Sequence, residues 1–319
     1  MTTDTEDYVP FDPHTPDFIL PQPLSATELM GLTLPPRELL LDPILPSRGL
    51  AMLYGPRGLG KTHVALGIAW AAASGERFLK WHAEVPRRVL YVDGEMPATD
   101  MQERLRLIGP IPTMPPPPGL SFLLADMLGP GMPDLGTLEG QGVLERTWGE
   151  TPPELLVIDN LSSLVGSARD NDADGWSIMQ NWLLRLRRKG VCVLIVHHAG
   201  KGGQQRGTSR REDVLDMVIA LRRPSDYEPK DGARFEVHLE KARGLYGPVT
   251  DPFEARLQPD ALGTPVWNWE PLRDAEFARA VALFKDGISP GDAAEELGVS
   301  RATAYRLKKK AIREGHIEK

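Results

Sequence analysis

Residues 49–74 read GLAMLYGPRGLGKTHVALGIAWAAAS and decide the fold of the chain. An apolar, strand-like run enters a glycine-rich turn at Gly55, and the chain leaves the turn after Thr62 in a helix-like run that ends near Ser74. The turn matches the pattern G-x-x-x-x-G-K-[ST], and the strand, turn and helix form the setting that a phosphate-binding loop requires. The stretch therefore predicts a loop that holds a nucleoside triphosphate.

The residue types of this loop have direct physical roles. Its glycines let successive backbone N–H groups converge on phosphate oxygens, and the following helix directs the positive end of its dipole to the same point. Lys61 can reach the β- and γ-phosphates, and the Thr62 hydroxyl can ligate Mg²⁺. We expect ATP and Mg²⁺ as cofactors, with nucleotide contacts from Gly55, Pro56, Arg57, Gly58, Leu59, Gly60, Lys61, Thr62 and His63.

Length and composition favour a globular enzyme. A chain of 319 residues, 41% of them hydrophobic, can bury a sizeable core and suggests one large domain plus a small one. Its single cysteine, Cys192, lies in the apolar run VCVLIV, which predicts a core residue and excludes a disulfide framework and a CxxC metal pair. No apolar run reaches the length of a membrane span and no signal-peptide pattern opens the chain, so we expect a cytoplasmic protein without a membrane partner.

Charge is distributed unevenly along the chain. The net charge of −7 does not by itself indicate a nucleic-acid partner. Residues 1–25 are acidic and rich in proline, which predicts a disordered tail that is either solvated or an interaction arm. Residues 298–319 carry seven basic and two acidic side chains. The basic carboxyl-terminal end is therefore the place to look for a polyanionic partner.

Strand-like and helix-like runs alternate after the phosphate loop. RVLYVDGEM, ELLVID and VCVLIV are typical of buried strands, and an amphipathic helix is expected over residues 174–189. Three more strand-like runs follow, MVIAL, FEVHLEKARG and FEARL. This alternation predicts an α/β fold with a mostly parallel sheet, and a ligand site at the carboxyl ends of its strands. We assign residues 26–270 to this domain and interpret the proline-rich residues 110–118 as an extended surface insertion.

Acidic residues end two of the expected strands. Asp159 follows the apolar run LLVI, where a carboxylate holds the Mg²⁺ of a loop-bound nucleotide. Glu95 follows the preceding strand, where a carboxylate can polarise the attacking water as a general base. Asp93 is the alternative for that role, or an ordinary turn residue. We favour Glu95 because its longer side chain reaches further across the loop.

The motifs GPRGLGKT, VLYVDGEMP, LLVIDNLSSL, VLIVHHAGKG and LEKARGLYGP, in this order, resemble the RecA-fold P-loop ATPases, specifically the RepA- and DnaB-like hexameric replicative helicases. The resemblance covers about residues 30–257. It implies that Lys61 and Thr62 bind the triphosphate and Mg²⁺, that Glu95 activates water and that Asp159 is the Walker B acid.

The same resemblance implies further residues of the reaction. His198, or its neighbour His197, stands where the family carries a polar γ-phosphate sensor, and a packed or capping histidine is the alternative. Lys241 and Arg243 match cations that reach across a subunit interface to the γ-phosphate of the neighbouring subunit. The resemblance thus predicts a homo-oligomer, a hexameric ring, in which catalysis requires assembly.

Two segments are candidates for contact with DNA. Lys201, Arg206, Arg210 and Arg211 alternate with glycines, which is typical either of a mobile loop on single-stranded DNA or of a solvated turn. Residues 271–319 are interpreted as a separate helical module with a first helix expected from Ala275 to Lys285. The residues after that helix resemble the helix-turn-helix of site-specific recombinases, with its second helix capped by Ser300. The alternative is a helical cap with a solvated lysine face. Expected contacts to duplex DNA are Arg301, Thr303, Tyr305, Arg306, Lys308, Lys309 and Lys310.

Two functions remain open from the sequence. The first is an ATP-hydrolysing DNA helicase of plasmid or mobile-element replication, delivered to its site by the carboxyl-terminal helices. The second is an ATP-switched DNA-binding regulator or recruitment factor that does not unwind DNA. The residues expected for hydrolysis favour the first function.

Overall fold

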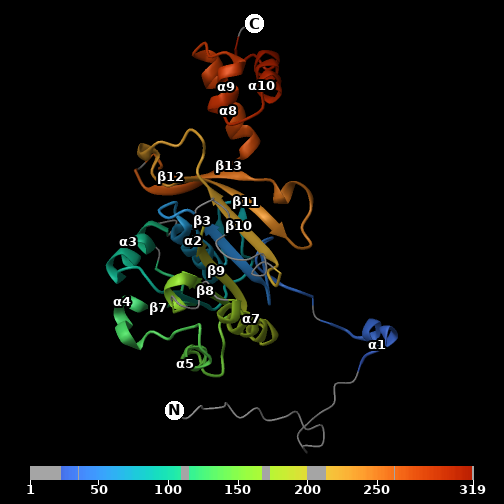
Figure 1. Ribbon diagram of the computed structural model, residues 1–319, viewed down its shortest axis with the longest axis vertical. Helices are drawn as coiled ribbons and strands as arrows, with labels where there is room; N and C mark the ends of the chain where they lie inside the picture. The colour runs from blue at the N-terminus through green and yellow to red at the C-terminus, as the bar shows by residue number, and fades with distance from the viewer. Residues whose placement is uncertain are drawn as a thin grey trace, which may run out of the picture. The chain divides into compact units, whose positions relative to one another are not determined.

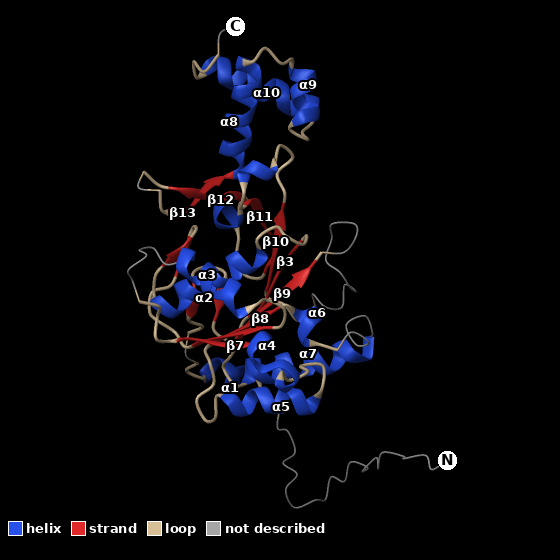
Figure 2. Cartoon of the chain, turned by 90° about the vertical axis from the view of Figure 1, so that its left-hand side faces the viewer, coloured by secondary structure: helices blue, strands red, loops and turns tan. Residues whose placement is uncertain are grey.

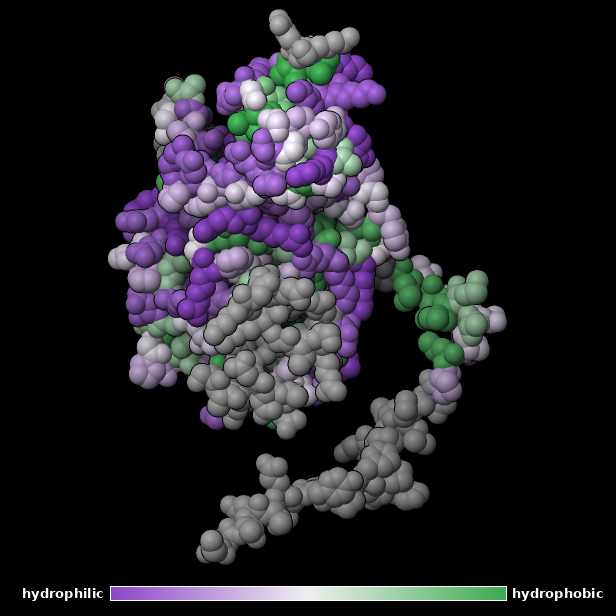
Figure 3. All heavy atoms as spheres, turned by 45° about the horizontal axis from the view of Figure 1, so that its top comes forward, coloured by the Kyte–Doolittle hydropathy of each residue, from purple (hydrophilic) through white to green (hydrophobic). Residues whose placement is uncertain are grey.

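The computed structural model describes residues 23–34, 36–108, 115–166, 173–199, 213–261 and 263–317. The chain divides into two units, residues 1–37 and residues 38–319. In the first unit, helix α1 (Ala26–Gly31) begins with a capping box between Ser25 and Glu28. Five large apolar side chains of this segment are exposed, and they colour it green in the space-filling view (Figure 3): Leu24, Leu29, Met30, Leu32 and Leu34.

A nine-stranded sheet runs through the centre of residues 38–319 (Figure 1). Its six strands from β10 to β7 are parallel, and β11 to β13 extend it as an antiparallel meander. The order across the sheet is β13 (Pro265–Pro271), β12 (Phe253–Pro259), β11 (Arg234–Ala242), β10 (Met217–Arg222), β3 (Leu50–Gly55), β9 (Cys192–His198), β8 (Leu155–Asp159), β6 (Val89–Asp93) and β7 (Leu120–Leu124).

Helices cover both faces of the parallel part of the sheet (Figure 2). One face packs against α2 (Lys61–Ser74) and α3 (Ala98–Ile108). The other packs against α5 (Leu138–Thr147), α6 (Leu161–Leu164) and α7 (Ala173–Arg188). Strands with both faces covered must be apolar throughout, which explains their continuous hydrophobic runs.

Strand β3 shows how the two faces share one sequence. Leu50, Met52 and Tyr54 belong to the core on the α7 side, and Ala51 and Leu53 belong to the core on the α2 side. Successive side chains of a strand point to opposite faces, so a six-residue apolar run supplies both cores. The strand therefore lies deep in the molecule and holds the phosphate loop at its end.

Short elements complete the second unit. Two small hairpins precede and follow α2, and three single-turn segments and one short helix connect the larger elements. They are β1 (Leu39–Leu41) with β2 (Leu45–Pro46), β4 (Arg77–Phe78) with β5 (Trp81–His82), η1 (Gly129–Gly131), η3 (Pro229–Asp231), η4 (Gly247–Thr250) and α4 (Ala125–Leu128).

Three helices end the chain and share a small apolar core of their own. They are α8 (Leu272–Lys285), α9 (Pro290–Glu296) and α10 (Arg301–Arg313). Val281 and Phe284 of α8 belong to this core, and Phe277 packs against it. Ser300 caps α10 by accepting a hydrogen bond from the Thr303 N–H at 3.1 Å.

The mostly parallel sheet and the carboxyl-terminal helices are as the sequence predicts. Cys192 is buried, as expected. Two edge strands, β7 and β13, were not predicted, and α8 begins at Leu272 rather than at residue 275. Of the proline-rich insertion, residues 115–118 form neither helix nor strand, and the rest lies outside the described residues, as do residues 1–22 of the tail. Within the described residues, no helix is both long and apolar enough to cross a membrane.

Candidate functional site

The phosphate loop connects β3 to α2 and has the backbone that its glycines allow. Gly58 and Gly60 have φ values of 71° and 102°, which side chains with a Cβ rarely adopt. A Cβ on Gly60 would also lie 3.2 Å from the Phe235 ring. Gly60 precedes the first turn of α2 and has no side chain that could cap it. Gly60 therefore leaves the first N–H groups of α2 without a side-chain partner, and such N–H groups can bind an anion.

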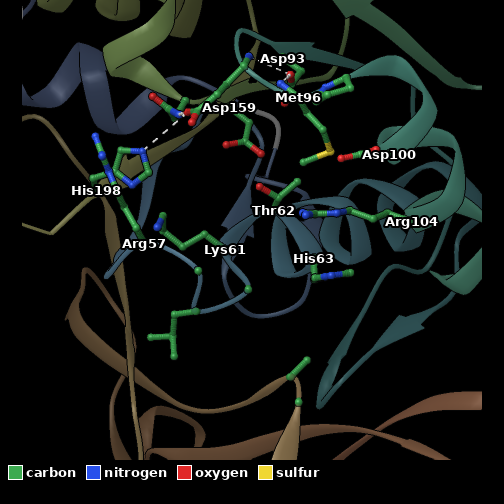
Figure 4. A pocket seen from close by; sticks show the side chains of 18 residues that line it. Arg57, Lys61, Thr62, His63, Asp93, Met96, Asp100, Arg104, Asp159 and His198 are labelled. Carbon is green, nitrogen blue, oxygen red and sulfur yellow. Dashed lines mark hydrogen bonds and ion pairs between the residues drawn. The ribbon is translucent and has the colours of Figure 1, made fainter. Parts of the chain in front are cut away.

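A cavity of about 520 Å³ opens at the carboxyl ends of the parallel strands, beside this loop (Figure 4). It joins the loop with the ends of β6, β8 and β9, with α3, and with the turn before β11. The lining residues are Arg57, Gly58, Leu59, Gly60, Lys61, Thr62, His63, Asp93, Glu95, Met96, Pro97, Asp100, Arg104, Asp159, Asn160, His198, Gly232 and Ala233.

Lys61 folds back onto its own loop. Its Nζ donates to the carbonyl oxygens of Gly55 at 3.0 Å and Pro56 at 2.8 Å. Burial lowers the pKa of Lys61 to about 8, although the carboxylates of Asp159 and Glu95 oppose the shift. A phosphate group beside the ammonium would favour its charged form. An anionic ligand in the loop would therefore stabilise the charged form of Lys61.

Asp159 ends β8 and is almost completely buried. It accepts hydrogen bonds from the Tyr91 hydroxyl at 2.6 Å and from the Thr62 side chain. Burial raises the pKa of Asp159, and these hydrogen bonds and Lys61 oppose that shift. Thr62 and Asp159 therefore lie together as two oxygen donors beside the loop. That arrangement fits Mg²⁺, which takes one or two protein oxygens and completes its shell with water and phosphate.

The two acids after β6 have different surroundings. The buried Asp93 accepts hydrogen bonds from the backbone N–H groups of Glu95 at 3.0 Å and Met96 at 2.6 Å. Its Oδ1 therefore holds the turn that follows the strand. Burial raises the pKa of Asp93 to about 6, and the two backbone hydrogen bonds oppose the shift. Glu95 has a side chain that is 67% exposed at the cavity. The geometry gives Asp93 a structural task and leaves the Glu95 carboxylate accessible to solvent.

Two neighbours hold the Glu95 carboxylate. The Asn160 side-chain amide donates to Glu95 Oε2 at 2.5 Å, and His198 Nε2 lies 3.9 Å from the same oxygen. Asn160 is itself fixed, because its Oδ1 accepts from the Ser163 N–H at the start of α6. Of the two adjacent histidines, His198 lines the cavity, whereas His197 is completely buried.

Several lining residues were missed by the sequence reasoning. Asp100 and Arg104 come from α3, which the sequence showed only as a helix. Asn160 follows Asp159, and Gly232 and Ala233 come from the turn before β11. No spacing in the sequence marks these positions, because they reach the cavity through the packing of α3 and β11 on the loop.

Other expected residues lie away from this cavity. Lys241 and Arg243, near the end of β11, are not among its lining residues. Arg243 is exposed, and it donates to the Asp213 carbonyl oxygen at 2.6 Å. The expected single-strand contacts Lys201, Arg206, Arg210 and Arg211 lie outside the described residues.

The first turns of α10 present most of the expected duplex contacts. Arg301, Tyr305, Arg306 and Lys309 are exposed, while Thr303 and Lys308 are partly covered. Lys310 differs from the expectation, because its Nζ lies 3.9 Å from the centre of the Phe277 ring and packs against this small domain. The face available for DNA is therefore centred on the first two turns of the helix.

Two domain families match the chain. The AAA domain family matches residues 16–204, more than half of the 319-residue chain, and the homeodomain-like domain family matches residues 273–318. Among solved structures, a KaiC-like protein from the hyperthermophilic archaeon Pyrococcus horikoshii OT3 is similar, with 17% identity and a TM-score of 0.49, covering 73% of this chain and 94% of that chain. No curated protein matches the chain. The chain belongs to the AAA domain family and is a P-loop ATPase with a mostly parallel sheet and a carboxyl-terminal helix-turn-helix domain.

Proposed function

We propose that the protein is an ATP-driven DNA motor, a RepA-like hexameric helicase that acts in plasmid or mobile-element replication. The observation that carries the proposal is the placement of Glu95. Its accessible carboxylate is held by Asn160 at the rim of a cavity that also contains Lys61, Thr62 and Asp159. Hydrolysis requires an accessible base at this point, and a motor must hydrolyse ATP in order to move.

The cavity residues divide the work of hydrolysis. The N–H groups of the loop and Lys61 bind the phosphates, and Thr62 and Asp159 hold Mg²⁺. Bound Mg²⁺ neutralises charge on the phosphates. Glu95 accepts a proton from the attacking water, and His198 lies close enough to Glu95 to sense the state of the γ-phosphate. In this proposal catalysis rests on charge placed in advance around the triphosphate.

Lys241 and Arg243 are proposed to act on a neighbouring subunit. Neither lines the cavity of its own chain, and Arg243 is exposed. A cation supplied by a second subunit stabilises the charge that develops on the phosphoryl oxygens. Hydrolysis then depends on assembly, as expected of a ring that moves along DNA.

DNA is proposed to meet the protein at two places. The exposed residues of α10, such as Arg301 and Arg306, bind duplex DNA and deliver the motor to its site. The basic segment from Lys201 to Arg211 is proposed to contact single-stranded DNA during movement.

The alternative, an ATP-switched regulator without unwinding activity, is favoured by one specific contact. Arg279 of α8 pairs with Glu254 of β12 at 2.8 Å and with Asp226 at 3.1 Å. This pairing ties the helix-turn-helix domain to the ATPase sheet. A regulator needs such a connection between nucleotide state and DNA binding, and a motor does not strictly require it.

Strand displacement on a forked duplex distinguishes the two functions. The wild-type protein with ATP and Mg²⁺ should separate the strands, and Lys61→Ala should not, because the loop loses its phosphate-binding cation. ATP hydrolysis and tight duplex binding without displacement, including in the presence of a loading partner, would contradict the helicase and support the regulator.

Subunit mixing tests the action in trans. Arg243→Ala and Glu95→Gln should each strongly reduce hydrolysis while nucleotide binding is kept. A mixture of the two variants should regain part of the activity, because some interfaces then combine an intact Glu95 with an intact Arg243. Normal hydrolysis by Arg243→Ala alone would refute the assignment.

A further inference from the structure

Tyr91 is a buried polar side chain that the proposed mechanism does not use. It lies in the middle of β6, is completely buried and belongs to the core on the α2 side of the sheet. Its hydroxyl donates to Oδ2 of Asp159, the carboxylate expected to hold Mg²⁺, at 2.6 Å. A phenylalanine would fill almost the same space without this hydrogen bond, so packing alone does not account for the hydroxyl.

The register of the sheet explains how the hydroxyl reaches this carboxylate. Strands β6 and β8 are parallel neighbours, and Tyr91 lies opposite Val157, two residues before Asp159. Tyr91 and Val157 both belong to the core on the α2 side, and side chains two residues apart in a strand share a face. Two residues of a strand span about 7 Å. A phenol ring carries its hydroxyl over that distance, whereas the hydroxyl of a serine or threonine stays near its own Cα.

The surroundings of Tyr91 and Asp159 restrain both side chains. Phe122 of β7 packs against Tyr91 with ring centres 5.6 Å apart, which limits the movement of the phenol ring. Asp159 is only 4% exposed, and it also accepts a hydrogen bond from the Thr62 side chain. A carboxylate with one oxygen held by a fixed donor cannot turn freely about its last bond. Its remaining lone pairs therefore keep one direction relative to the Thr62 hydroxyl.

We propose that Tyr91 is a positioning residue for Mg²⁺, because its hydroxyl holds the Asp159 carboxylate in the orientation that binds the metal of a loop-bound nucleotide. The inference rests on the proposed nucleotide and magnesium site and deepens it, since Tyr91 does not line the cavity and acts through Asp159. Groups that hydrogen-bond a metal ligand orient that ligand, and their replacement typically weakens metal binding by about 10- to 100-fold.

Nucleotide binding measured at a series of Mg²⁺ concentrations tests the proposal. The full chain is titrated by calorimetry with the non-hydrolysable analogue AMP-PNP, first in EDTA and then with increasing Mg²⁺. In Tyr91→Phe, the Mg²⁺ concentration that gives half of the gain in affinity should rise by about 10- to 100-fold. The affinity in EDTA should stay that of the wild type, because the phosphate loop itself is unchanged. Mn²⁺ bound in the presence of AMP-PNP, measured by electron paramagnetic resonance, should weaken by the same factor.

Tyr54→Phe is the matched control. Tyr54 of β3 is 4% exposed, and its hydroxyl donates to Glu240 Oε2 at 2.6 Å. Neither Tyr54 nor Glu240 lines the cavity. The control thus removes the same kind of hydrogen bond, from a buried tyrosine to a carboxylate, at a place away from the expected metal. Its Mg²⁺ dependence should equal that of the wild type.

Two results would overturn the assignment. An unchanged Mg²⁺ dependence in Tyr91→Phe would show that the hydroxyl does not position Asp159. An equal loss of affinity in EDTA and in Mg²⁺ would show that Tyr91 supports the fold of the site and not the metal. If Tyr91→Phe does not fold, as judged by circular dichroism, 4-aminophenylalanine and 4-fluorophenylalanine at position 91 answer the same question. The first keeps a donor and should keep the wild-type Mg²⁺ dependence, and the second fills the space without a donor and should not.

The same titration separates this inference from the proposed function. Wild-type protein that binds AMP-PNP neither in EDTA nor in Mg²⁺ would contradict the proposed function and the inference together. Wild-type protein that binds AMP-PNP more tightly in Mg²⁺, with Tyr91→Phe responding equally, would contradict the inference alone.

Discussion

Glu254 of β12 is completely buried, and its carboxylate forms ion pairs with three arginines. Its carboxylate accepts from Arg234 at 2.7 Å, from Arg279 at 2.8 Å and from Arg256. The side chains of Arg234 and Arg279 are only 8% and 13% exposed. We predict that Glu254→Gln, which keeps the shape and removes the charge, lowers the free energy of unfolding markedly, because it leaves buried guanidinium groups without their shared counter-charge.

The magnitude follows from what remains around each arginine. Breaking a buried ion pair by removing one partner costs about 3–5 kcal/mol. Arg234 keeps Asp226 and Asp231, and Arg279 keeps Asp226, so the loss should lie near the lower end of that range. Glu270 is the matched control.

Glu270 pairs with Arg256 at 3.2 Å, and its side chain is 42% exposed. Glu270→Gln should therefore cost only about 0–1 kcal/mol. The assay is urea denaturation of the wild type and both variants, followed by circular dichroism. If Glu254→Gln and Glu270→Gln lower the free energy of unfolding equally, the buried network does not stabilise the fold and the reasoning is refuted.

Three further predictions concern the active site and the DNA-binding face. Glu95→Gln should keep its affinity for MgATP and lower kcat by roughly 10²- to 10⁴-fold, and single-turnover hydrolysis at the wild-type rate would exclude Glu95 as the base. Burial raises the pKa of Asp93 to about 6, so the folded protein binds the proton of this carboxyl more tightly than the unfolded chain does. The protonated carboxyl therefore contributes stability that is fully present below about pH 4 and is lost as the pH rises through about 6. Asp93→Asn should therefore lessen the fall in unfolding free energy between these pH values, measured by denaturation at each pH, and an unchanged pH profile would contradict the shift. Lys309→Ala should weaken binding to all duplexes alike and reduce the slope of log affinity against log salt by about 1, as measured by fluorescence anisotropy, while a change confined to one DNA sequence would place Lys309 at a base.

The parts of the fold that the sequence predicts well are those with local signals. The phosphate loop depends on glycines at fixed spacing, and the helix-turn-helix depends on the caps and apolar faces around Ser300. The buried parallel strands are visible because both of their faces must be apolar, as β3 shows. Each of these signals is contained within a few consecutive residues.

The missed strands lie at the two edges of the sheet. In β7, between Leu120 and Leu124, all five side chains are partly or fully exposed, and the strand directly follows the proline-rich run. In β13, Trp267 and Trp269 alternate with polar residues, and a proline stands at each end. Edge strands tolerate proline and need only one apolar face, so they carry a weaker pattern than central strands.

The missed site residues depend on tertiary packing. Arg104 reaches the cavity only because Met101 anchors α3 in one orientation, and an arginine on an amphipathic helix otherwise indicates a solvated face. Asn160 and Glu95 are 65 residues apart in sequence, and they meet because β6 and β8 lie side by side. A single sequence contains no local sign of either arrangement.

The junction between sheet and carboxyl-terminal helices has a mechanical consequence. Strand β13 ends at Pro271 and α8 begins at Leu272, so no linker residues separate them. If α10 holds DNA as proposed, force applied to that DNA would reach the edge of the sheet without an intervening linker. From β13 the hydrogen-bonded ladders of β12 and β11 lead to the turn at Gly232 and Ala233, which lines the cavity beside the phosphate loop. In the proposed function, tension on a bound duplex and occupancy of the phosphate loop would therefore act on the same set of strands.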